Sequence, residues 1–401
     1  MDLESGHPFF LLKNGLPYNY PRLKTSVTAD VIILGGGISG ALTAYYLVNA
    51  GVNCVLIDAR TIGFGSTCAS TSLLQYEIDT PLCQLIRKLG EANAVRAYEL
   101  CFNSLDILGD LAAAIGFNDY QFVQSLYYAA YEKDLPFLKE EYSIRDKHGF
   151  KVSYLDRPAV KNEYGFDAPG AILSSTAAQT DAYLFTHKLL QASIKKGLSV
   201  YDRSPVTGIR HGRRDVTLTT ESGGSLKAKK LVYATGYEAV NYIDKKIVDL
   251  HSTFACVSEQ ANNESVFWKD NALLWNTANP YLYMRTSMDR RILIGGRDEL
   301  FYNPNKRDKL MASKTRQLVK DFHRVFPNID FTPEFSWAGT FGATKDGLPF
   351  IGSYNKLPNS FFALGYGGNG ITFSLIAAEI LTDLITGKKN KDASIFSFNR
   401  I

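Results

Sequence analysis

Three glycines and one aspartate stand at a spacing that suits the binding of a dinucleotide. Gly35, Gly37 and Gly40 follow a short apolar run, and Asp58 comes 18 residues after Gly40. In such a turn the first glycine permits the tight bend, the second lets the backbone approach a pyrophosphate, and the third lets a helix pack close to a strand. We expect the Asp58 carboxylate to accept hydrogen bonds from adenosine ribose hydroxyls and to repel a 2′-phosphate, which disfavours an NADP-type ligand.

The elements around these residues complete the pattern. The apolar run 31–34 predicts a strand buried on both faces, a helical pattern continues to Gly51, and residues 54–57 predict a second strand that ends at Asp58. The helix N-terminus would face the phosphates. One alternative is a glycine-rich turn in another kind of α/β protein. Another is a membrane span, because residues 31–48 carry no charge, but their glycines and the lack of a preceding cationic segment disfavour it.

Composition excludes several classes of function. The 401 residues are enough for two to three domains, and Lys plus Arg (44) barely exceeds Asp plus Glu (40), so no nucleic-acid partner is indicated. The five cysteines form no CxxC pair and the six histidines form no ligand pattern, so we expect no metal site. Free thiols fit a reducing compartment, and we expect a cytoplasmic protein without a membrane span.

Further along the chain, glycine-rich and hydroxyl-rich segments adjoin predicted strands and helices. Residues 61–72 form a small, hydroxyl-rich loop that could close over a pyrophosphate or a ring system, although an ordinary flexible loop has the same composition. Helical patterns cover 81–115, 182–196 and about 306–325. A strand-like piece at 226–232 runs into the turn at 234–236. Near the C-terminus, a strand at 361–364, glycines between 365 and 370 and a helix up to 385 form a second strand–turn–helix unit.

Together these segments resemble the D-amino-acid-oxidase-like family of FAD-dependent amine oxidoreductases. The motifs, in the expected order, are GGGISGALTAYYL with Asp58, GSTCASTS at 65–72, ATG at 234–236, and TKDGLPFIG with GYGGNG between 344 and 370. The resemblance spans the chain from about residue 30, and the C-terminal pair is its discriminating part. It implies bound FAD and the oxidation of a C–N bond in a small amine or amino acid by hydride transfer to the flavin N5, giving an imine that hydrolyses.

The resemblance also implies a set of FAD-binding residues. Gly35, Gly37 and Gly40 would hold the pyrophosphate, and Asp58 the ribose. The helix that starts near Gly370 would stabilise the negative charge that develops on the flavin pyrimidine edge. The remaining residues that the resemblance assigns to FAD are Ile38, Ser39, Ala59, Arg60, Ser66, Thr67, Ala69, Ser70, Thr71, Val206, Ala234, Thr235, Gly236, Gly367, Gly368, Asn369, Gly370, Ile371 and Thr372.

Substrate contacts are predicted from fewer signals, and no catalytic side chain is identified. Tyr76, Tyr283 and Tyr366 could wall an aromatic pocket over the flavin, but each also fits the core. Several amino-acid-specific relatives carry a carboxylate-binding arginine where this chain has Phe341. Arg285 is the nearest substitute for that anchor, and a structural arginine fits it equally well.

Two departures from the family pattern are informative. Gly339 stands where sarcosine oxidases carry the cysteine that binds flavin covalently, and no histidine lies between residues 60 and 75. We therefore expect non-covalent FAD. Leu293 stands where the same oxidases place a lysine that assists oxygen, which slightly favours a dehydrogenase with another electron acceptor.

The resemblance further implies a fold that is α/β and α+β, with two parts. A Rossmann-like FAD-binding domain, with a central parallel sheet flanked by helices, would be discontinuous and comprise residues 1–85, 170–245 and 335–401. A substrate-binding domain with a mixed, largely antiparallel sheet would comprise 86–169 and 246–334. The competing functions are an NAD(P)H-using flavoprotein reductase or monooxygenase and a non-catalytic flavin-binding subunit. The sequence does not determine whether the protein forms a homo-oligomer or which partner accepts its electrons.

Overall fold

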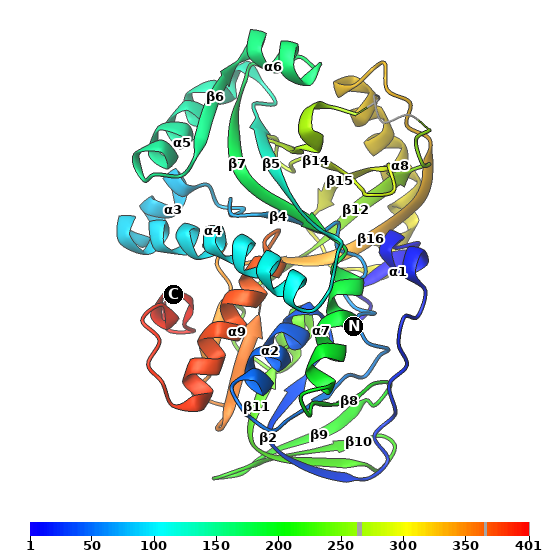
Figure 1. Cartoon of the computed structure of the whole chain (residues 1–401), viewed down its shortest axis with the longest axis vertical. Coiled ribbons are helices and arrows are strands. Elements are labelled where there is room, and N and C mark those ends of the chain that lie inside the picture. The colour runs from blue at the N-terminus through cyan, green and yellow to red at the C-terminus, as the bar shows by residue number, and fades with distance from the viewer. Residues whose placement is uncertain (263–266, 365–366, 401) are drawn as a thin grey trace.

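The computed structural model describes residues 1–262, 267–364 and 367–400. Within these residues the strands form two sheets, one of eight strands and one of ten. Figure 1 shows the eight-stranded sheet in the lower half of the molecule and the ten-stranded sheet in the upper half. Helix α4 (Glu91–Ala114) lies at mid-height and contacts elements of both halves.

The eight-stranded sheet has a parallel centre. Its order is β17-β18-β11-β2-β3-β8, and the hairpin of β9 and β10 pairs with the first half of β11. Strands β18, β11, β2, β3 and β8 run parallel to one another. The bounds are β2 (Ser26–Leu34), β3 (Cys54–Ile57), β8 (Ser199–Tyr201), β9 (Val206–His211), β10 (Val216–Thr220), β11 (Ser225–Tyr233), β17 (Phe350–Ser353) and β18 (Ser360–Leu364).

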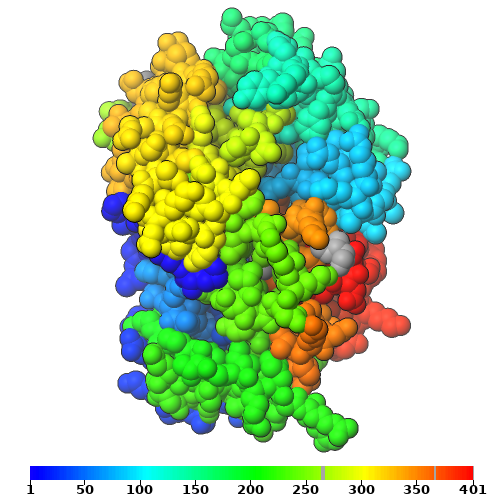
Figure 2. All heavy atoms as spheres, turned by 180° about the vertical axis from the view of Figure 1, so that it is seen from behind, coloured from blue at the N-terminus to red at the C-terminus, as the bar shows by residue number. Residues whose placement is uncertain are grey.

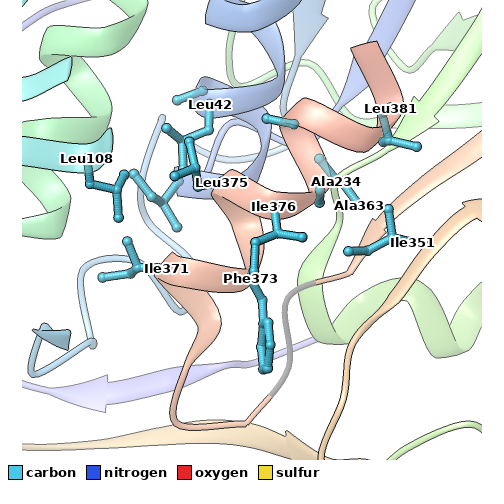
Figure 3. Packing of buried hydrophobic residues seen from close by; sticks show 14 of the residues in the cluster. Leu42, Leu108, Ala234, Ile351, Ala363, Ile371, Phe373, Leu375, Ile376 and Leu381 are labelled. Carbon is cyan, nitrogen blue, oxygen red and sulfur yellow. The ribbon is translucent and has the colours of Figure 1, made fainter. Parts of the chain in front are cut away.

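Helices cover one face of this sheet and supply a large core. The helices are α2 (Ile38–Asn49), α7 (Ala182–Ile194) and α9 (Gly370–Thr386). Val31 and Ile33 of β2 point into the core beneath these helices, whereas Ile32 and Leu34 pack into the core on the opposite face. Both faces of β2 are therefore buried, as its continuous apolar run predicts. Figure 3 shows the α9 side chains packing between Leu42 of α2, Leu108 of α4 and the strands β17 and β18.

The ten-stranded sheet is mixed and mostly antiparallel. Its order is β1-β16-β12-β15-β14-β13-β5-β7-β4, and β6 pairs with β7. Among the described pairs of this sheet, β13 and β5 alone run parallel. The bounds are β1 (Glu4–Gly6), β4 (Leu73–Gln75), β5 (Tyr120–Tyr128), β6 (Val152–Asp156), β7 (Gly170–Thr180), β12 (Asp249–Ser258), β13 (Leu273–Asn276), β14 (Tyr283–Thr286), β15 (Ile292–Glu299) and β16 (Pro333–Ala343). The predicted combination of a parallel and a largely antiparallel sheet is thereby confirmed.

The remaining helices lie mainly around the ten-stranded sheet. Helix α8 packs against β12, β15 and β16 through an apolar face that includes Leu318 and Phe322. The pattern predicted as one helix over 81–115 is divided at Gly90, whose positive φ of 79° breaks the helix. The bounds are α1 (Phe9–Asn14), α3 (Leu82–Leu89), α5 (Leu135–Lys147), α6 (Arg157–Tyr164) and α8 (Pro304–Val325), with single 3₁₀ turns η1 (Glu132–Asp134), η2 (Gly236–Asn241), η4 (Lys269–Asn271) and η5 (Ala393–Phe396).

The N-terminal segment adds a strand and a helix to the upper half of the molecule (Figure 1). It contributes β1, which pairs with β16, and the short helix α1. Asp2 and Glu4 accept hydrogen bonds from the buried Arg307 of α8, and Asp2 also bonds Tyr302. Figure 2 shows these dark-blue residues against the yellow part of the chain around residue 300. The segment therefore closes one edge of the ten-stranded sheet.

The two sheets divide the chain into alternating segments. The eight-stranded sheet takes strands from 26–57, 199–233 and 350–364, and the ten-stranded sheet takes strands from 4–6, 73–75, 120–180, 249–299 and 333–343. Strands β1, β4, β7 and β16 thus pair in the ten-stranded sheet, although residues 1–85, 170–245 and 335–401 are the expected FAD-binding segments. The chain crosses between the halves several times, and the cavity described below lies at these crossings.

Candidate functional site

One long cavity is lined by residues of both sheets. It begins where β2 and β11 end, at Leu34 and Ala234, and extends past the start of α9 to side chains of β14 and β15. The carboxyl ends of parallel strands are the usual ligand-binding edge of such a sheet. The predicted FAD residues that line the cavity are Gly35, Gly37, Ile38, Ser39, Asp58, Ala59, Arg60, Ser66, Thr67, Ala69, Ser70, Thr71, Val206, Ala234, Thr235, Gly236, Gly367, Gly368, Asn369, Gly370 and Ile371.

The glycine turn after β2 is fixed by close backbone contacts. Gly35 has a positive φ of 116°, and a Cβ there would lie 2.4 Å from the Ala234 carbonyl oxygen. A Cβ on Gly40 would lie 1.9 Å from the Gly35 carbonyl oxygen, so helix α2 can approach β2 only with glycine at this position. Gly40 lies outside the cavity lining, so its role is to let α2 pack against the turn after β2. The turn aims the N-terminus of α2 at the cavity.

Asp58 lies at the end of β3, where its side chain meets this turn. One carboxylate oxygen accepts a hydrogen bond from the Gly36 amide at 2.6 Å, and the other accepts one from the Arg60 amide at 2.8 Å. Burial raises the pKa of Asp58, and the two backbone donors oppose that shift. The side chain of Arg60 is bonded to Glu238. Asp58 is therefore held in one orientation, with further lone pairs able to accept hydrogen bonds from a ligand.

The hydroxyl-rich loop at residues 61–72 lies over the start of α2. The Thr67 hydroxyl accepts a hydrogen bond from the Ile38 amide at 3.1 Å, which anchors the loop to the helix. From the ten-stranded sheet, the indole of Trp337 donates to the Ala69 carbonyl at 2.8 Å. The hydroxyls of Ser66 and Thr235 are buried and find no hydrogen-bond partner among the described residues. Such orphaned donors beside a cavity call for an acceptor from a ligand.

The C-terminal glycine turn forms the next part of the wall. The Gly368 amide donates to Asp79 at 2.7 Å, and the Asn369 side chain donates to the carbonyls of Gln75 and Glu77, both at 2.9 Å. Asn369 thus ties the turn to the segment after β4. Thr372 lies outside the cavity lining and its hydroxyl donates to the Asn369 carbonyl. Tyr366, a predicted substrate contact, lies outside the described residues.

The far part of the cavity, which we name the sheet end, is lined by Gln75, Glu77, Asp79, Thr253, Trp275, Tyr281, Tyr283 and Asp298. Tyr283 is the one described residue here that was predicted as a substrate contact. Its ring lies against Gly295, where a Cβ would come within 2.3 Å of the ring, so that glycine makes room for it. Tyr281 donates a hydrogen bond to Asp79 at 3.2 Å.

Two other predicted substrate residues do not line the cavity. Tyr76 is fully buried, stacks on Phe150 with ring centroids 5.2 Å apart, and shares a hydrogen bond with Ser174. The guanidinium of Arg285 donates to the carbonyls of Ser72 (2.8 Å), Thr180 (2.9 Å) and Thr286 (3.1 Å). Burial lowers the pKa of Arg285 to about 10, so it remains charged at neutral pH. Arg285 therefore holds the end of the 61–72 loop.

Sequence reasoning missed the acids of the sheet end. Glu77 and Asp79 follow β4 at alternating positions, and Asp298 lies in β15 two residues after Gly296. Asp298 stands between Arg297 and Glu299, so its local sequence resembles an ordinary charged strand end and gives no signal of a site. Among the residues that the structure describes there is no cluster of potential metal ligands. None of the described helices is both long and apolar enough to span a membrane.

These features fit a bound FAD. The N-termini of α2 and α9 both face the cavity, the glycine turns leave backbone amides accessible, and Ser66 and Thr235 supply unused hydroxyls. Asp58 supplies a fixed acceptor for ribose hydroxyls. When bound, FAD supplies a two-electron acceptor.

Comparison with known proteins agrees with this reading. The chain matches the DAO family, "FAD dependent oxidoreductase", over residues 30–384. It is 24% identical over 379 residues to gamma-glutamylputrescine oxidoreductase of Escherichia coli, covering 92% of this chain and 86% of that protein. It is 23% identical over 375 residues to glycine oxidase of Bacillus subtilis, covering 90% and 95%. The crystal structure of glycine oxidase from Geobacillus kaustophilus superimposes with a TM-score of 0.78 at 21% identity, covering 93% and 99%.

The family match covers most of the chain, and the two sheets share the fold of a glycine oxidase. The chain belongs to the DAO family of FAD-dependent oxidoreductases and is an enzyme whose cofactor is FAD.

Proposed function

We propose that this enzyme oxidises the C–N bond of a small amine or amino acid. The observation that carries the proposal is the single cavity, which passes both helix N-termini and ends among the polar and aromatic side chains of the sheet end. The names of the two relatives, an oxidoreductase of gamma-glutamylputrescine and a glycine oxidase, support this substrate class. In the reaction the substrate loses a hydride from carbon and a proton from nitrogen. A C=N bond forms, the hydride would pass to the two-electron acceptor that FAD supplies when bound, and water then hydrolyses the imine to a carbonyl compound and ammonia or a smaller amine.

The protein's own residues position the reactants. The first turn of α9 has no side-chain cap among the described residues. Its backbone amides and the positive end of its dipole point to the cavity, where they would stabilise negative charge on the cofactor. Asp58, Ser66 and Thr235 would hold the dinucleotide. Tyr281, Tyr283 and Trp275 would enclose the substrate and exclude water.

An anaerobic screen tests the reaction. Purified holoenzyme is mixed with amines and with D- and L-amino acids, and loss of the oxidised flavin absorbance is followed. We expect bleaching by at least one compound of this class. Protein that stays yellow with every amine and amino acid would support a non-catalytic subunit. Bleaching by NADH or NADPH alone would support a flavoprotein reductase.

We further propose that FAD is held without a covalent bond. Among the described residues that line the cavity there is neither cysteine nor histidine, and Gly339 stands at the lining position where a linking cysteine was considered. Cys68 is buried outside the lining, and its thiol donates to the Gly65 carbonyl. Acid precipitation should therefore leave free FAD in the supernatant. Flavin colour that remains in the pellet would overturn this.

The electron acceptor is proposed to be something other than oxygen. Leu293, at the position of the oxygen-assisting lysine, is buried in a core cluster outside the cavity, and no lysine lines the cavity among the described residues. Reduced enzyme should transfer electrons faster to an artificial dye than to dissolved oxygen. Stoichiometric peroxide release at the rate of turnover would contradict this proposal.

A further inference from the structure

The sheet end of the cavity carries acids from separate elements. Glu77 and Asp79 follow β4, and Asp298 belongs to β15. All three line the cavity together with aromatic side chains. Burial raises the pKa of each carboxyl group, and the charge of Asp79 raises the pKa of Asp298 further. Asp79 and Asp298 thus act on one another electrostatically, and a cation bound beside them would favour the ionised form of both.

No positively charged side chain of the described lining supplies that cation. Arg60 is the sole Lys or Arg among the described residues that line the cavity, and its guanidinium is bonded to Glu238 beside Asp58. Arg145 pairs with Glu77 at 3.3 Å and with Glu141 at 2.6 Å from behind the cavity lining. Among the described residues, the acids of the sheet end without a cationic partner are therefore Asp79 and Asp298. Lys314 is engaged by Glu299 and the Arg297 carbonyl.

Two of the acids also present unused oxygens. Glu77 accepts hydrogen bonds from Ser174 and Arg145 on one oxygen, whereas its other oxygen, Oε2, has no partner among the described residues. The Oδ1 atom of Asp298 is likewise buried without a partner in the described part of the chain. Both are acceptors without donors, and an ammonium group, which has three donors and no acceptor, complements them.

The aromatic side chains around these acids fit the same ligand. Trp275, Tyr281 and Tyr283 line the sheet end, and the Tyr281 ring lies 6.2 Å from the Trp275 ring and 5.8 Å from the Tyr283 ring. Aromatic faces attract alkylammonium groups and pack against methylene chains. A carboxylate in this position would instead meet three acids, and the nearby Arg285 is occupied by three carbonyl oxygens.

We propose that the substrate is an amine that carries a second, non-reacting positive charge and no carboxylate, such as a diamine, with the second ammonium held by Glu77, Asp79 and Asp298. This inference rests on the proposed function and names its substrate class. It separates this enzyme from relatives named for amino-acid substrates, because the sheet end selects a cation where an amino-acid site needs a carboxylate anchor.

Matched ligands test the proposal with the holoenzyme. Each member of a series of straight-chain diamines, including putrescine, is compared with the monoamine in which a methyl group replaces one ammonium, and with the ω-amino acid in which a carboxylate replaces it. Glycine and D-alanine complete the set. Binding is measured anaerobically by the heat stabilisation of the holoenzyme, and oxidation by bleaching of the flavin. We expect at least one diamine to bind about tenfold or more tightly than both of its matched compounds.

Conservative variants locate the effect. Asp298→Asn should lower the ratio of diamine to monoamine affinity by about tenfold or more. It removes the carboxylate charge that would pair with the second ammonium, while the side chain keeps its size and shape. Asp79→Asn should act in the same direction. Asp110→Asn, an exposed aspartate on α4 outside the cavity, is the matched control and should leave the ratio unchanged. FAD content and the circular dichroism spectrum of each variant show whether it is folded.

The outcomes separate this inference from the proposed function. Diamines that bind selectively but never bleach the flavin would uphold the cation site and count against amine oxidation. Bleaching by glycine, D-alanine or an ω-amino acid, with no selective binding of any diamine, would uphold amine oxidation and overturn this inference. Monoamines that bind as well as the matched diamines, or a complete absence of binding, would also overturn it.

Discussion

At the residue scale, carboxylates mark both parts of the cavity. Asp58 receives two backbone amides at the glycine turn, so its orientation is set by the fold before any ligand arrives. Asp79 is positioned by the Gly368 amide and the Tyr281 hydroxyl. Asp298 keeps one buried oxygen without a partner among the described residues. Glu77 is paired with Arg145, whereas no lysine or arginine among the described residues that line the sheet end pairs with Asp79 or Asp298.

Replacing Asp58 tests its role in holding the cofactor. In Asp58→Ala the Gly36 and Arg60 amides lose their acceptor and a ribose would lose a charged partner. A hydrogen bond to a charged group contributes about 1.5–3 kcal/mol, so we expect FAD affinity to fall by about tenfold or more. The flavin-to-protein ratio after extended dialysis measures this. Asp110→Ala serves as the control, and full occupancy in Asp58→Ala would refute the role.

At the element scale, a buried ion cluster ties helix α5 to the segment that carries the acids. Glu141 of α5 accepts hydrogen bonds from the Leu82 and Cys83 amides at the start of α3, both at 2.9 Å. Arg145, one helical turn further, bonds Glu141 and Glu77. These charged side chains are fully buried, so the position of Glu77 in the cavity depends on α5.

This cluster predicts a large difference between two arginines. Arg145→Met should lower the free energy of unfolding by about 3–5 kcal/mol, because it leaves two buried carboxylates without their cation. Arg87 pairs with Glu140 on the exposed side of the same helix, and Arg87→Met should cost less than about 1 kcal/mol. Urea unfolding of both variants gives the comparison. Equal losses would show that the buried cluster contributes no more than a surface ion pair.

At the scale of the whole molecule, two sheets with separate cores share one cavity. From the ten-stranded sheet, the Trp337 indole donates a hydrogen bond to the Ala69 carbonyl in the FAD-binding part of the cavity. Both glycine turns follow strands of the eight-stranded sheet. The division into an FAD-binding and a substrate-binding domain remains our proposal. Because β7 and β16 pair within the ten-stranded sheet, we would assign both strands to the substrate-binding domain.

The same architecture couples the sheet end to global stability. Burial and the neighbouring Asp79 raise the pKa of Asp298 to about 6, while Thr253 and Lys314 oppose the shift. Because the folded-state pKa is raised, the stability linked to the protonated form is present below about pH 4 and is lost as the pH rises through about 6. The Asp298→Asn side chain does not ionise, so this variant does not lose stability in that pH range.

We therefore expect substrate-free Asp298→Asn to gain on the wild type as the pH rises from 4 to 7, by up to about 2 kcal/mol in the free energy of unfolding. Chemical unfolding of both proteins at each pH measures the difference. Asp110→Asn is measured at the same pH values as the exposed control. A difference that stays constant between pH 4 and 7 would contradict the raised pKa.

Local patterns in the sequence predicted a dinucleotide site, and the family resemblance that its motifs carry predicted FAD and the two kinds of sheet. The glycine spacing before α2, the apolar runs of β2 and β3, Asp58 and the C-terminal glycine turn are contiguous signals, and each states a backbone requirement that only certain residue types meet. The parallel and antiparallel sheets and the FAD-dependent family are accordingly confirmed. The roles of the individual FAD residues remain predictions, and their place around the cavity supports them.

The substrate part was decided by tertiary structure alone. Tyr76 and Tyr283 look alike in the sequence, but only Tyr283 lines the cavity, because the pairing of β14 with β15 places it over Gly295 while Tyr76 packs against Phe150. Arg285 donates a hydrogen bond to the Ser72 carbonyl, which lies 213 residues away in the chain. Glu77, Asp79 and Asp298 meet only when β4 and β15 are brought to one cavity. Recognition of a substrate depends on side chains that converge from distant strands, and that convergence is a property of the packed sheets that no local spacing encodes.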